Sequence, residues 1–279
     1  MRAVIGGAHS WSIGGADVAL AAQPELPAGL SFHLAPEPPR PEAVAAGTWR
    51  RMSRVARIAA VCAAPILERR ADRDELALFW GTGIGEFSST AGFLRTLFTK
   101  GPLGASPLLF QNAVHNAPAG HLSIAFGLRG PSETICAGPQ TSIRVLERAL
   151  AWVTLYDRPA LVLVADDLGP DVQQGYTFAE ASAPMGEGGA ALLLLPDGDG
   201  PELTWADAPP AEGDWQRRHA YPLEPPCSNS PGPSHDARLG LFPAVDLVAL
   251  AACARTGGTV AWAAPAGGRE RSVRLGVRA

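Results

Sequence analysis

Few side chains in this 279-residue sequence could act as nucleophiles, bases or metal ligands. It has four cysteines and six histidines, and no two cysteines form a C-x-x-C pair. No histidine stands at zinc-finger spacing from a cysteine, so we expect neither a metal site nor a cofactor. Cys136 could be an acyl nucleophile with His115 or His121 as its base. The alternative is that Cys136 is a small hydrophobic residue in a buried strand.

Two further segments resemble ligand sites without completing one. Gly81 to Gly85 is rich in glycine, but it lacks the Lys-Ser/Thr ending of a P-loop and the full G-x-G-x-x-G of a dinucleotide site. Asp166 and Asp167 follow a predicted strand and could bind a metal ion. Adjacent acids at a strand end are more typical of a solvated turn, so we predict no metal there.

The elements that would position these residues alternate along the chain. Apolar runs and helical periodicity predict an α/β domain. The expected strands are 2–6, 76–80, 132–137, 161–165, 190–195, 203–206, 259–263 and 272–277. The expected helices are 50–70, 87–99, 110–126, 140–153 and 244–255. Residues 24–43 hold six prolines and are predicted to be a loop.

Composition narrows the class of protein. Hydrophobic residues make up 47% of the chain, charged residues 18%, and the net charge is −4. This balance favours a soluble globular domain and gives no electrostatic case for binding nucleic acid. No apolar run is long enough for a membrane span, and the N-terminus lacks a signal-peptide pattern. We therefore expect a cytoplasmic protein with reduced thiols.

Several motifs, in order, resemble one protein family. They are Arg50-Arg51-Met52-Ser53-Arg54, the helix 110–120 with Val114-His115-Asn116, Leu128-Arg129-Gly130-Pro131-Ser132, and Met185-Gly186-Glu187-Gly188-Gly189-Ala190-Ala191-Leu192. Leu239-Gly240 followed by Ala244-Val245-Asp246 matches a late helix more loosely. Together they resemble the N-terminal half of the β-ketoacyl synthases, in the thiolase-like superfamily.

The resemblance implies a thiolase-like layered α/β/α fold, essentially one ketosynthase half with a truncated C-terminal part. We expect a single domain over residues 1–279. Within it, residues 1–195 would form the thiolase-like half and 196–235 a Pro/Gly-rich loop region. Residues 236–279 would add a short helix and two strands.

The resemblance also implies that the condensing chemistry is lost. The family's cysteine nucleophile follows the glycine of its G-P-S motif by nine residues, and here Gly130 leads to Pro139, with Gln140 next. Proline cannot be a nucleophile, although it suits the first position of a helix. The family's N-A-H-G-T loop is missing, and Ala237 is nearest to the position of its second histidine. We therefore predict no catalytic residues.

Glutamine beside a lost cysteine resembles the chain-length factors, which are inactive partners of type II polyketide and aryl-polyene ketosynthases. The implied partner is a catalytic β-ketoacyl synthase, with an acyl carrier protein contacted through the complex. The residues implied to face the partner or its acyl tunnel are Phe110, Asn112, Val114, His115 and Asn116.

Two other functions stay open. The chain could be an acyl-thioester transferase or hydrolase that uses Cys136. It could also be a homodimeric binding or scaffold protein that kept a thiolase-like fold. Acylation of Cys136 by a thioester would favour the first, and the absence of a synthase partner the second.

Overall fold

A single mixed β-sheet forms the centre of the molecule. The computed structural model describes residues 1–206, 236–240, 242–256, 263–266 and 269–276. Its sheet runs in the order β10-β11-β9-β1-β8-β6-β4-β5, with β2 paired to β1. The strands are β1 (Arg2–Ser12), β2 (Gly15–Ala16), β4 (Ala77–Gly81), β5 (Ser132–Ile135), β6 (Ala160–Asp166), β8 (Gly188–Leu195), β9 (Glu202–Ala206), β10 (Ala263–Ala266) and β11 (Arg269–Gly276). A separate parallel pair joins β3 (Ser31–His33) to β7 (Pro184–Gly186).

Parallel pairing is confined to one end of this sheet. β4 is parallel to both β5 and β6, whereas β8 is antiparallel to β6 and to β1. Every residue of β6 is buried, as the predicted run of branched side chains at 161–165 requires for a strand covered on both faces. The carboxyl ends of β4, β5 and β6 therefore meet at one edge of the sheet.

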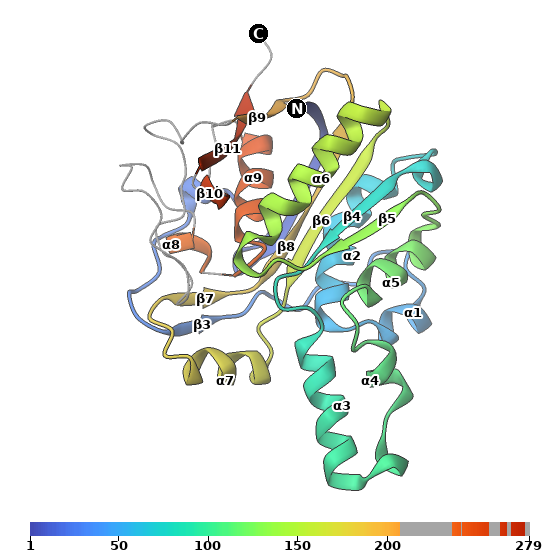
Figure 1. Cartoon of the computed structure of the whole chain (residues 1–279), viewed down its shortest axis with the longest axis vertical. Coiled ribbons are helices and arrows are strands. Elements are labelled where there is room, and N and C mark those ends of the chain that lie inside the picture. The colour runs from blue at the N-terminus through green and yellow to red at the C-terminus, as the bar shows by residue number, and fades with distance from the viewer. Residues whose placement is uncertain (207–235, 241, 257–262, 267–268, 277–279) are drawn as a thin grey trace.

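Helices cover both faces of the sheet, so the predicted layered α/β/α order is confirmed (Figure 1). α2 (Arg54–Leu67) and α5 (Ala117–Phe126) pack on one face, and α6 (Thr141–Tyr156) and α9 (Val245–Thr256) on the other. Each face has its own hydrophobic core. The remaining helices are α1 (Ala46–Arg51), α7 (Pro170–Phe178), α8 (Asp236–Leu239) and the short 3-10 turns 20–22 and 73–75. None of the helices in these described ranges is long and apolar enough to span a bilayer.

The start of α2 shows how local sequence sets this packing. Ser53 is the N-cap, and its hydroxyl accepts a hydrogen bond from the amide of Ala56 at 3.2 Å. Val55, Ile58 and Cys62 then repeat on one helical face and are buried. The helical periodicity predicted for 50–70 is confirmed over 54–67, whereas Met52 and Ser53 interrupt the expected helix between α1 and α2. Cys62 is a core residue as expected.

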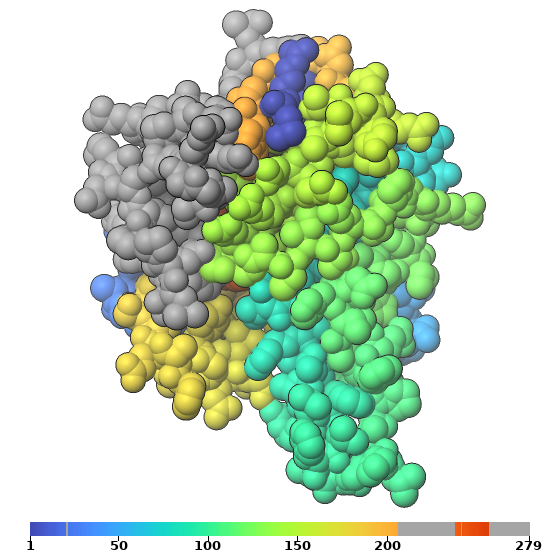
Figure 2. Space-filling model, viewed as in Figure 1, coloured from blue at the N-terminus to red at the C-terminus, as the bar shows by residue number. Residues whose placement is uncertain are grey.

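One segment extends away from this body. α3 (Phe87–Lys100), the 3-10 turn Pro102–Gly104 and α4 (Pro107–Gln111) form a protruding hairpin, visible at the bottom of Figures 1 and 2. We call residues 87–111 the arm. Several of its large apolar side chains are exposed, among them Phe98 at 81% and Phe110 at 64%.

Some expected elements differ from the structure. The helix expected over 110–126 is two helices, because Pro118 starts α5 in its first turn and Asn112 to Asn116 form the connection. α7 and the β3–β7 pair were not predicted. The expected loop 196–235 lies largely outside the described residues, as does most of the expected strand 259–263.

Candidate functional site

The predicted strand–turn–helix around the lost nucleophile is present. β5 ends at Ile135, Gly138 turns the chain with a φ of +53°, and α6 begins at Thr141. The Thr141 hydroxyl accepts from the amide of Ala137 at 3.1 Å and donates to the carbonyl of Gly138 at 2.7 Å. This hydrogen bonding fixes the turn independently of any catalytic side chain. We call residues 136–141 the elbow.

Pro139 and Gln140 lie in the elbow where α6 begins. Pro139 is in the 3-10 turn Gly138–Gln140 at the N-terminus of the helix, a position that tolerates proline. Gln140 accepts a hydrogen bond on its Oε1 from Arg144 at 3.3 Å. The two residues therefore serve the helix start here, and the loss of catalysis at this position stays a prediction.

Cys136 does not lie inside a buried strand, which corrects that alternative. β5 ends one residue earlier, and the Cys136 side chain is exposed. Its thiol donates to the carbonyl of Gly83 at 3.4 Å. Partial burial raises the pKa of the Cys136 thiol, and the nearby Asp166 carboxyl adds to this rise. A hydrogen bond with the amide of Gly138 opposes it. The environment therefore disfavours the thiolate that an acyl nucleophile needs.

The two histidines considered as bases contact other groups. The Nε2 of His121 is hydrogen-bonded to the Oδ1 of Asn112 at 2.9 Å, and burial, then Arg51, lowers the pKa of His121. The ring of His115 lies against Gly85, where an added Cβ would be only 2.0 Å from its Nδ1. Asn112 thus holds the His121 ring, and within the described residues no hydrogen bond joins either ring to the thiol of Cys136.

The Cys136 environment predicts slow, pH-dependent labelling. With a soluble alkylating reagent and peptide mass spectrometry, we expect Cys136 to react and the buried Cys62 and Cys253 to stay unmodified in the folded chain. Because the pKa of Cys136 is raised, its rate near neutral pH should be lower than that of a free cysteine and should increase with pH. A rate at neutral pH above that of free cysteine would instead indicate an activated nucleophile.

The residues predicted to face a partner divide into two groups. Phe110, Val114, His115 and Asn116 are exposed. Asn112 is 5% exposed, and its Nδ2 donates to the carbonyl of Arg51 at 2.8 Å while its Oδ1 binds His121. Asn112 thus fastens the end of the arm to the body of the molecule, and the surface available to a partner consists of the other four.

The glycine-rich turn after β4 encloses a buried carboxyl group. Asp166, at the end of β6, accepts on Oδ1 from the Thr82 hydroxyl at 2.9 Å and the Gly83 amide at 2.7 Å. Burial raises the pKa of Asp166 to about 7, although these donors and the Ile84 amide oppose the rise and Asp167 adds to it. Its Oδ2 has no hydrogen-bond partner among the described residues. The expected solvated turn is therefore wrong, because the turn 81–86 covers the acids.

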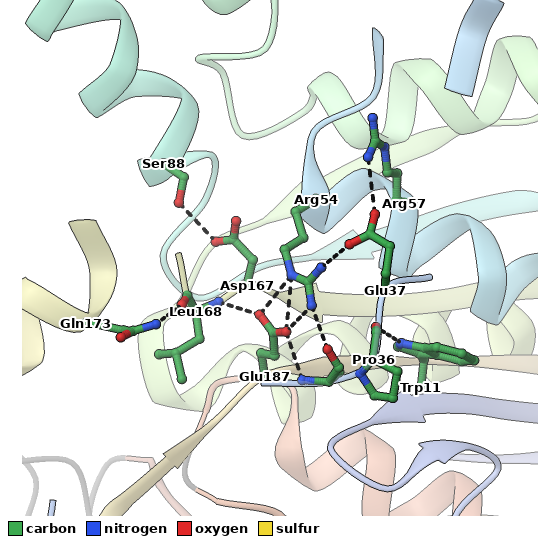
Figure 3. Close-up of polar contacts among 11 residues, drawn as sticks. Trp11, Pro36, Glu37, Arg54, Arg57, Ser88, Asp167, Leu168, Gln173 and Glu187 are labelled. Carbon is green, nitrogen blue, oxygen red and sulfur yellow. Dashed lines mark hydrogen bonds and ion pairs between the residues drawn. The ribbon is translucent and has the colours of Figure 1, made fainter. Parts of the chain in front are cut away.

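A second buried carboxylate organises the region beside Asp167 (Figure 3). The Glu187 side chain is fully buried and accepts hydrogen bonds from the guanidinium of Arg54 and the amides of Ala35 and Leu168. Arg54 also pairs with Glu37 at 2.7 Å. Glu187 belongs to the M-G-E-G motif singled out in the sequence, but no pattern indicated that Arg54 would be its partner.

No described group of three or more His, Cys, Asp or Glu side chains is arranged to hold a metal ion. The buried acids instead accept hydrogen bonds from backbone amides, hydroxyls and Arg54, apart from Asp166 Oδ2, which has no partner among the described residues. The arrangement is a polar support beneath the elbow and the start of the arm.

Comparisons with known proteins agree with this geometry. A family model described as the β-ketoacyl synthase N-terminal domain matches residues 24–225. The chain is 30% identical over 139 residues to 3-oxoacyl-(acyl-carrier-protein) synthase 2 from Vibrio harveyi, covering 49% of this chain and 30% of that protein. The corresponding synthase of Vibrio cholerae serotype O1 is 30% identical over 124 residues. The match thus spans less than a third of the length of these relatives.

Solved structures extend the likeness to the whole fold. A ketosynthase in complex with its chain length factor from Xenorhabdus doucetiae superimposes with a TM-score of 0.64 at 17% identity, covering 99% of both chains. The ishigamide ketosynthase/chain length factor gives a TM-score of 0.70 at 15% identity, with 100% of both chains covered. A β-ketoacyl synthase from Burkholderia phymatum gives 0.71 at 12% identity, again with full coverage.

Proposed function

The chain belongs to the β-ketoacyl synthase N-terminal domain family, and on this premise we propose that it is a non-catalytic, chain-length-factor-like subunit. It would pair with an active β-ketoacyl synthase and shape that enzyme's acyl tunnel. The observation that carries the proposal is the strand, turn and helix that run from β5 through the elbow to α6, with Pro139 at the position where the family resemblance predicts the nucleophile. Polyketide, aryl-polyene or fatty-acid-like synthesis in the cytoplasm is the setting we propose.

The chemistry supports a silent role for the elbow. Condensation needs a thiolate at a helix N-terminus to accept the acyl chain. Pro139 has no nucleophilic atom, and the raised pKa of Cys136 keeps the nearby thiol protonated at neutral pH. His121 is hydrogen-bonded to Asn112, and no described hydrogen bond joins His115 or His121 to the Cys136 thiol. The elbow would then act as a structural support, and the partner would supply the cysteine and both histidines.

The arm supports the pairing part of the proposal. Phe110 and Val114 are 64% and 50% exposed, and Phe110 packs against Phe93 with ring centroids 5.5 Å apart. An exposed apolar surface of this kind is typical of a protein interface. Phe110, Val114, His115 and Asn116 would then meet the partner and close one end of its acyl tunnel.

The names of the solved relatives suggest the class of partner. Two of them are complexes of a ketosynthase with a chain length factor, and a third, with a TM-score of 0.73 at 12% identity, is a ketosynthase with a type II acyl-carrier protein. We therefore propose a catalytic synthase as the partner and contact with an acyl carrier protein through the complex.

Co-expression tests this function directly. The tagged chain is produced with candidate synthases from its own genome, and the purified complex is weighed and assayed for elongation. We expect a one-to-one pair whose activity is lost when the partner's cysteine is replaced and is kept after Cys136→Ala. A homodimer that takes no synthase would support the scaffold alternative, and acylation of Cys136 by a thioester would support the transferase or hydrolase alternative.

Phe110 is expected to influence product length. In the active pair, Phe110→Ala should enlarge the closed end of the tunnel and allow at least one more elongation cycle, whereas Phe110→Trp should shorten the product. Mass spectrometry of the released chains measures this. Phe178→Ala is the matched control, because Phe178 is 91% exposed on α7 outside the predicted surface. Equal product lengths for both alanine variants would contradict a tunnel role for Phe110.

A further inference from the structure

The arm is fastened to the body through the first turn of α3. The Ser89 hydroxyl donates to Glu86 Oε2 at 2.8 Å, and the Ser88 hydroxyl to Asp167 at 3.5 Å. The Ser53 hydroxyl, at the start of α2, donates to the other oxygen of Glu86. Glu86 is 3% exposed, and its two oxygens link the first turn of α3 to the start of α2 from the inside. The position of the arm therefore depends on this buried carboxyl group.

Negative charge is in excess around Glu86. Asp166, Asp167 and Glu187 are also buried, and we call these three with Glu86 the root cluster. Arg54 is the cation that faces it, and its guanidinium already pairs with Glu187 and Glu37 (Figure 3). Asp167 interacts electrostatically with Glu86, Asp166 and Glu187, whereas Arg54 acts on Glu187 and Asp167 and is already paired with Glu37, so keeping all four buried carboxyl groups charged is costly.

Electrostatics identify which groups hold protons. Burial raises the pKa of Glu86 to about 7; the Ser53 and Ser89 hydroxyls oppose the rise, and Asp167 contributes to it. Burial and then Glu187 raise the pKa of Asp167 to about 6, whereas Ser88 and Arg54 lower it. Of the other titratable groups nearby, Cys136 interacts with Asp166 rather than Glu86, and the His115 ring lies against Gly85, next to Glu86. Glu86 thus titrates near neutral pH against one charged neighbour, Asp167.

We propose that the root cluster is a proton-operated clasp: a proton on Glu86 holds the first turn of α3 against the body, and its loss loosens the arm. Burial disfavours a charged Glu86 and Asp167 adds to that cost, so without the proton an opening that exposes Glu86 to water becomes less costly. Phe110, at the end of the arm, belongs to the partner surface of the proposed function, and on that function pairing takes up a proton and is favoured at lower pH.

Hydrogen exchange of the chain alone tests the clasp without any partner. Amide protection across residues 87–111, corrected for the intrinsic effect of pH on exchange, is compared at about pH 6 and about pH 8. If Glu86 returns to its ordinary pKa of 4.5 in the open state, linkage predicts a fall of about 10-fold in the protection factor of the arm. Protection within β6 and β8 should not follow this change.

Matched variants distinguish a clasp from a general loss of stability. In Glu86→Gln the group cannot ionise, so the arm should remain equally protected at both pH values. In Asp167→Asn the midpoint of loosening should move to lower pH, since Asp167 raises the pKa of Glu86. Glu75→Gln makes the same change on an exposed side chain and should behave like the wild type.

An arm whose protection does not change with pH in the wild type would overturn the clasp, as would a Glu86→Gln variant that keeps the full change. Either result leaves the co-expression test unaffected, because that test depends on pairing and not on the proton. Conversely, a pH-dependent arm in a chain that takes no synthase would keep the clasp and remove the pairing function.

Discussion

Replacing Glu187 with alanine should lower the free energy of unfolding by about 3–5 kcal/mol, the usual cost of breaking a buried ion pair by removing one partner. The Glu187 side chain is fully buried, and its oxygens accept from the amides of Ala35 at 2.9 Å and Leu168 at 2.8 Å. They also accept from the Nε of Arg54 at 3.1 and 3.2 Å. The variant would leave two amides and part of a guanidinium without an acceptor. Urea unfolding followed by circular dichroism measures the change.

The exposed ion pair between Arg148 and Glu133 provides the control. Its side chains are 59% and 39% exposed, so Arg148→Ala should change stability by no more than about 1 kcal/mol. Glu187→Gln keeps the shape of the side chain and one acceptor oxygen. Its loss of unfolding free energy should therefore lie between those of Glu187→Ala and Arg148→Ala. If Glu187→Ala and Arg148→Ala were equally mild, the network drawn in Figure 3 would not be a structural support.

The sequence predicted the elements whose pattern is local. The unbroken apolar run at 161–165 indicated a strand buried on both faces, and β6 is one. The turn to α6 was predicted because Pro139 is compatible with a helix start and Ile143, Leu146 and Leu150 lie on one face. In each case the information is contained within about a dozen consecutive residues.

The site was less predictable because its contacts join distant residues. Arg54 and Glu187 are 133 positions apart, and neither periodicity nor turn propensity relates them. Asp166 and Asp167 were expected in a solvated turn because adjacent acids are costly to bury. The available signal was that Gly81 to Glu86 follows β4, which is parallel to β6, so both segments must leave the sheet at the same edge.

The prediction of one helix over 110–126 was wrong for a related reason. Its residues are helix-compatible, but Asn112 makes tertiary hydrogen bonds to Arg51 and His121 that a continuous helix would not permit. α7 escaped prediction because its sequence shows little helical amphipathicity, with Val172 its one buried residue. Pro118 at the start of α5 and the tertiary contacts of Asn112 together divide the first segment, whereas α7 lacks a local signal.

Asp166→Asn should make stability less dependent on pH. Burial raises the pKa of Asp166 from 3.8 to about 7, so between these values the folded chain holds a proton that the unfolded chain has lost. The free energy of unfolding should therefore fall by an amount on the order of 2–4 kcal/mol for this group as pH rises through this window. Above the window it should level off. The asparagine cannot ionise, so denaturation midpoints should change less from about pH 4 to about pH 7. The decline of stability with rising pH should not vanish in this variant, because Glu86 and Asp167 also lose protons over this range and contribute their own decline.

The slope with pH, rather than stability at one pH, is the decisive quantity. In the variant, the amide oxygen can still accept from Thr82, Gly83 and Ile84, but the amide nitrogen replaces an Oδ2 that has no described partner. An unsatisfied amide donor at that position would offset part of the stability that the variant gains above pH 7 by not ionising. Asp166→Ala removes the acceptor altogether and should be destabilising at every pH. Asp74→Asn, on an exposed side chain, should keep the wild-type slope, and the same slope in Asp166→Asn would mean that Asp166 is ionised throughout.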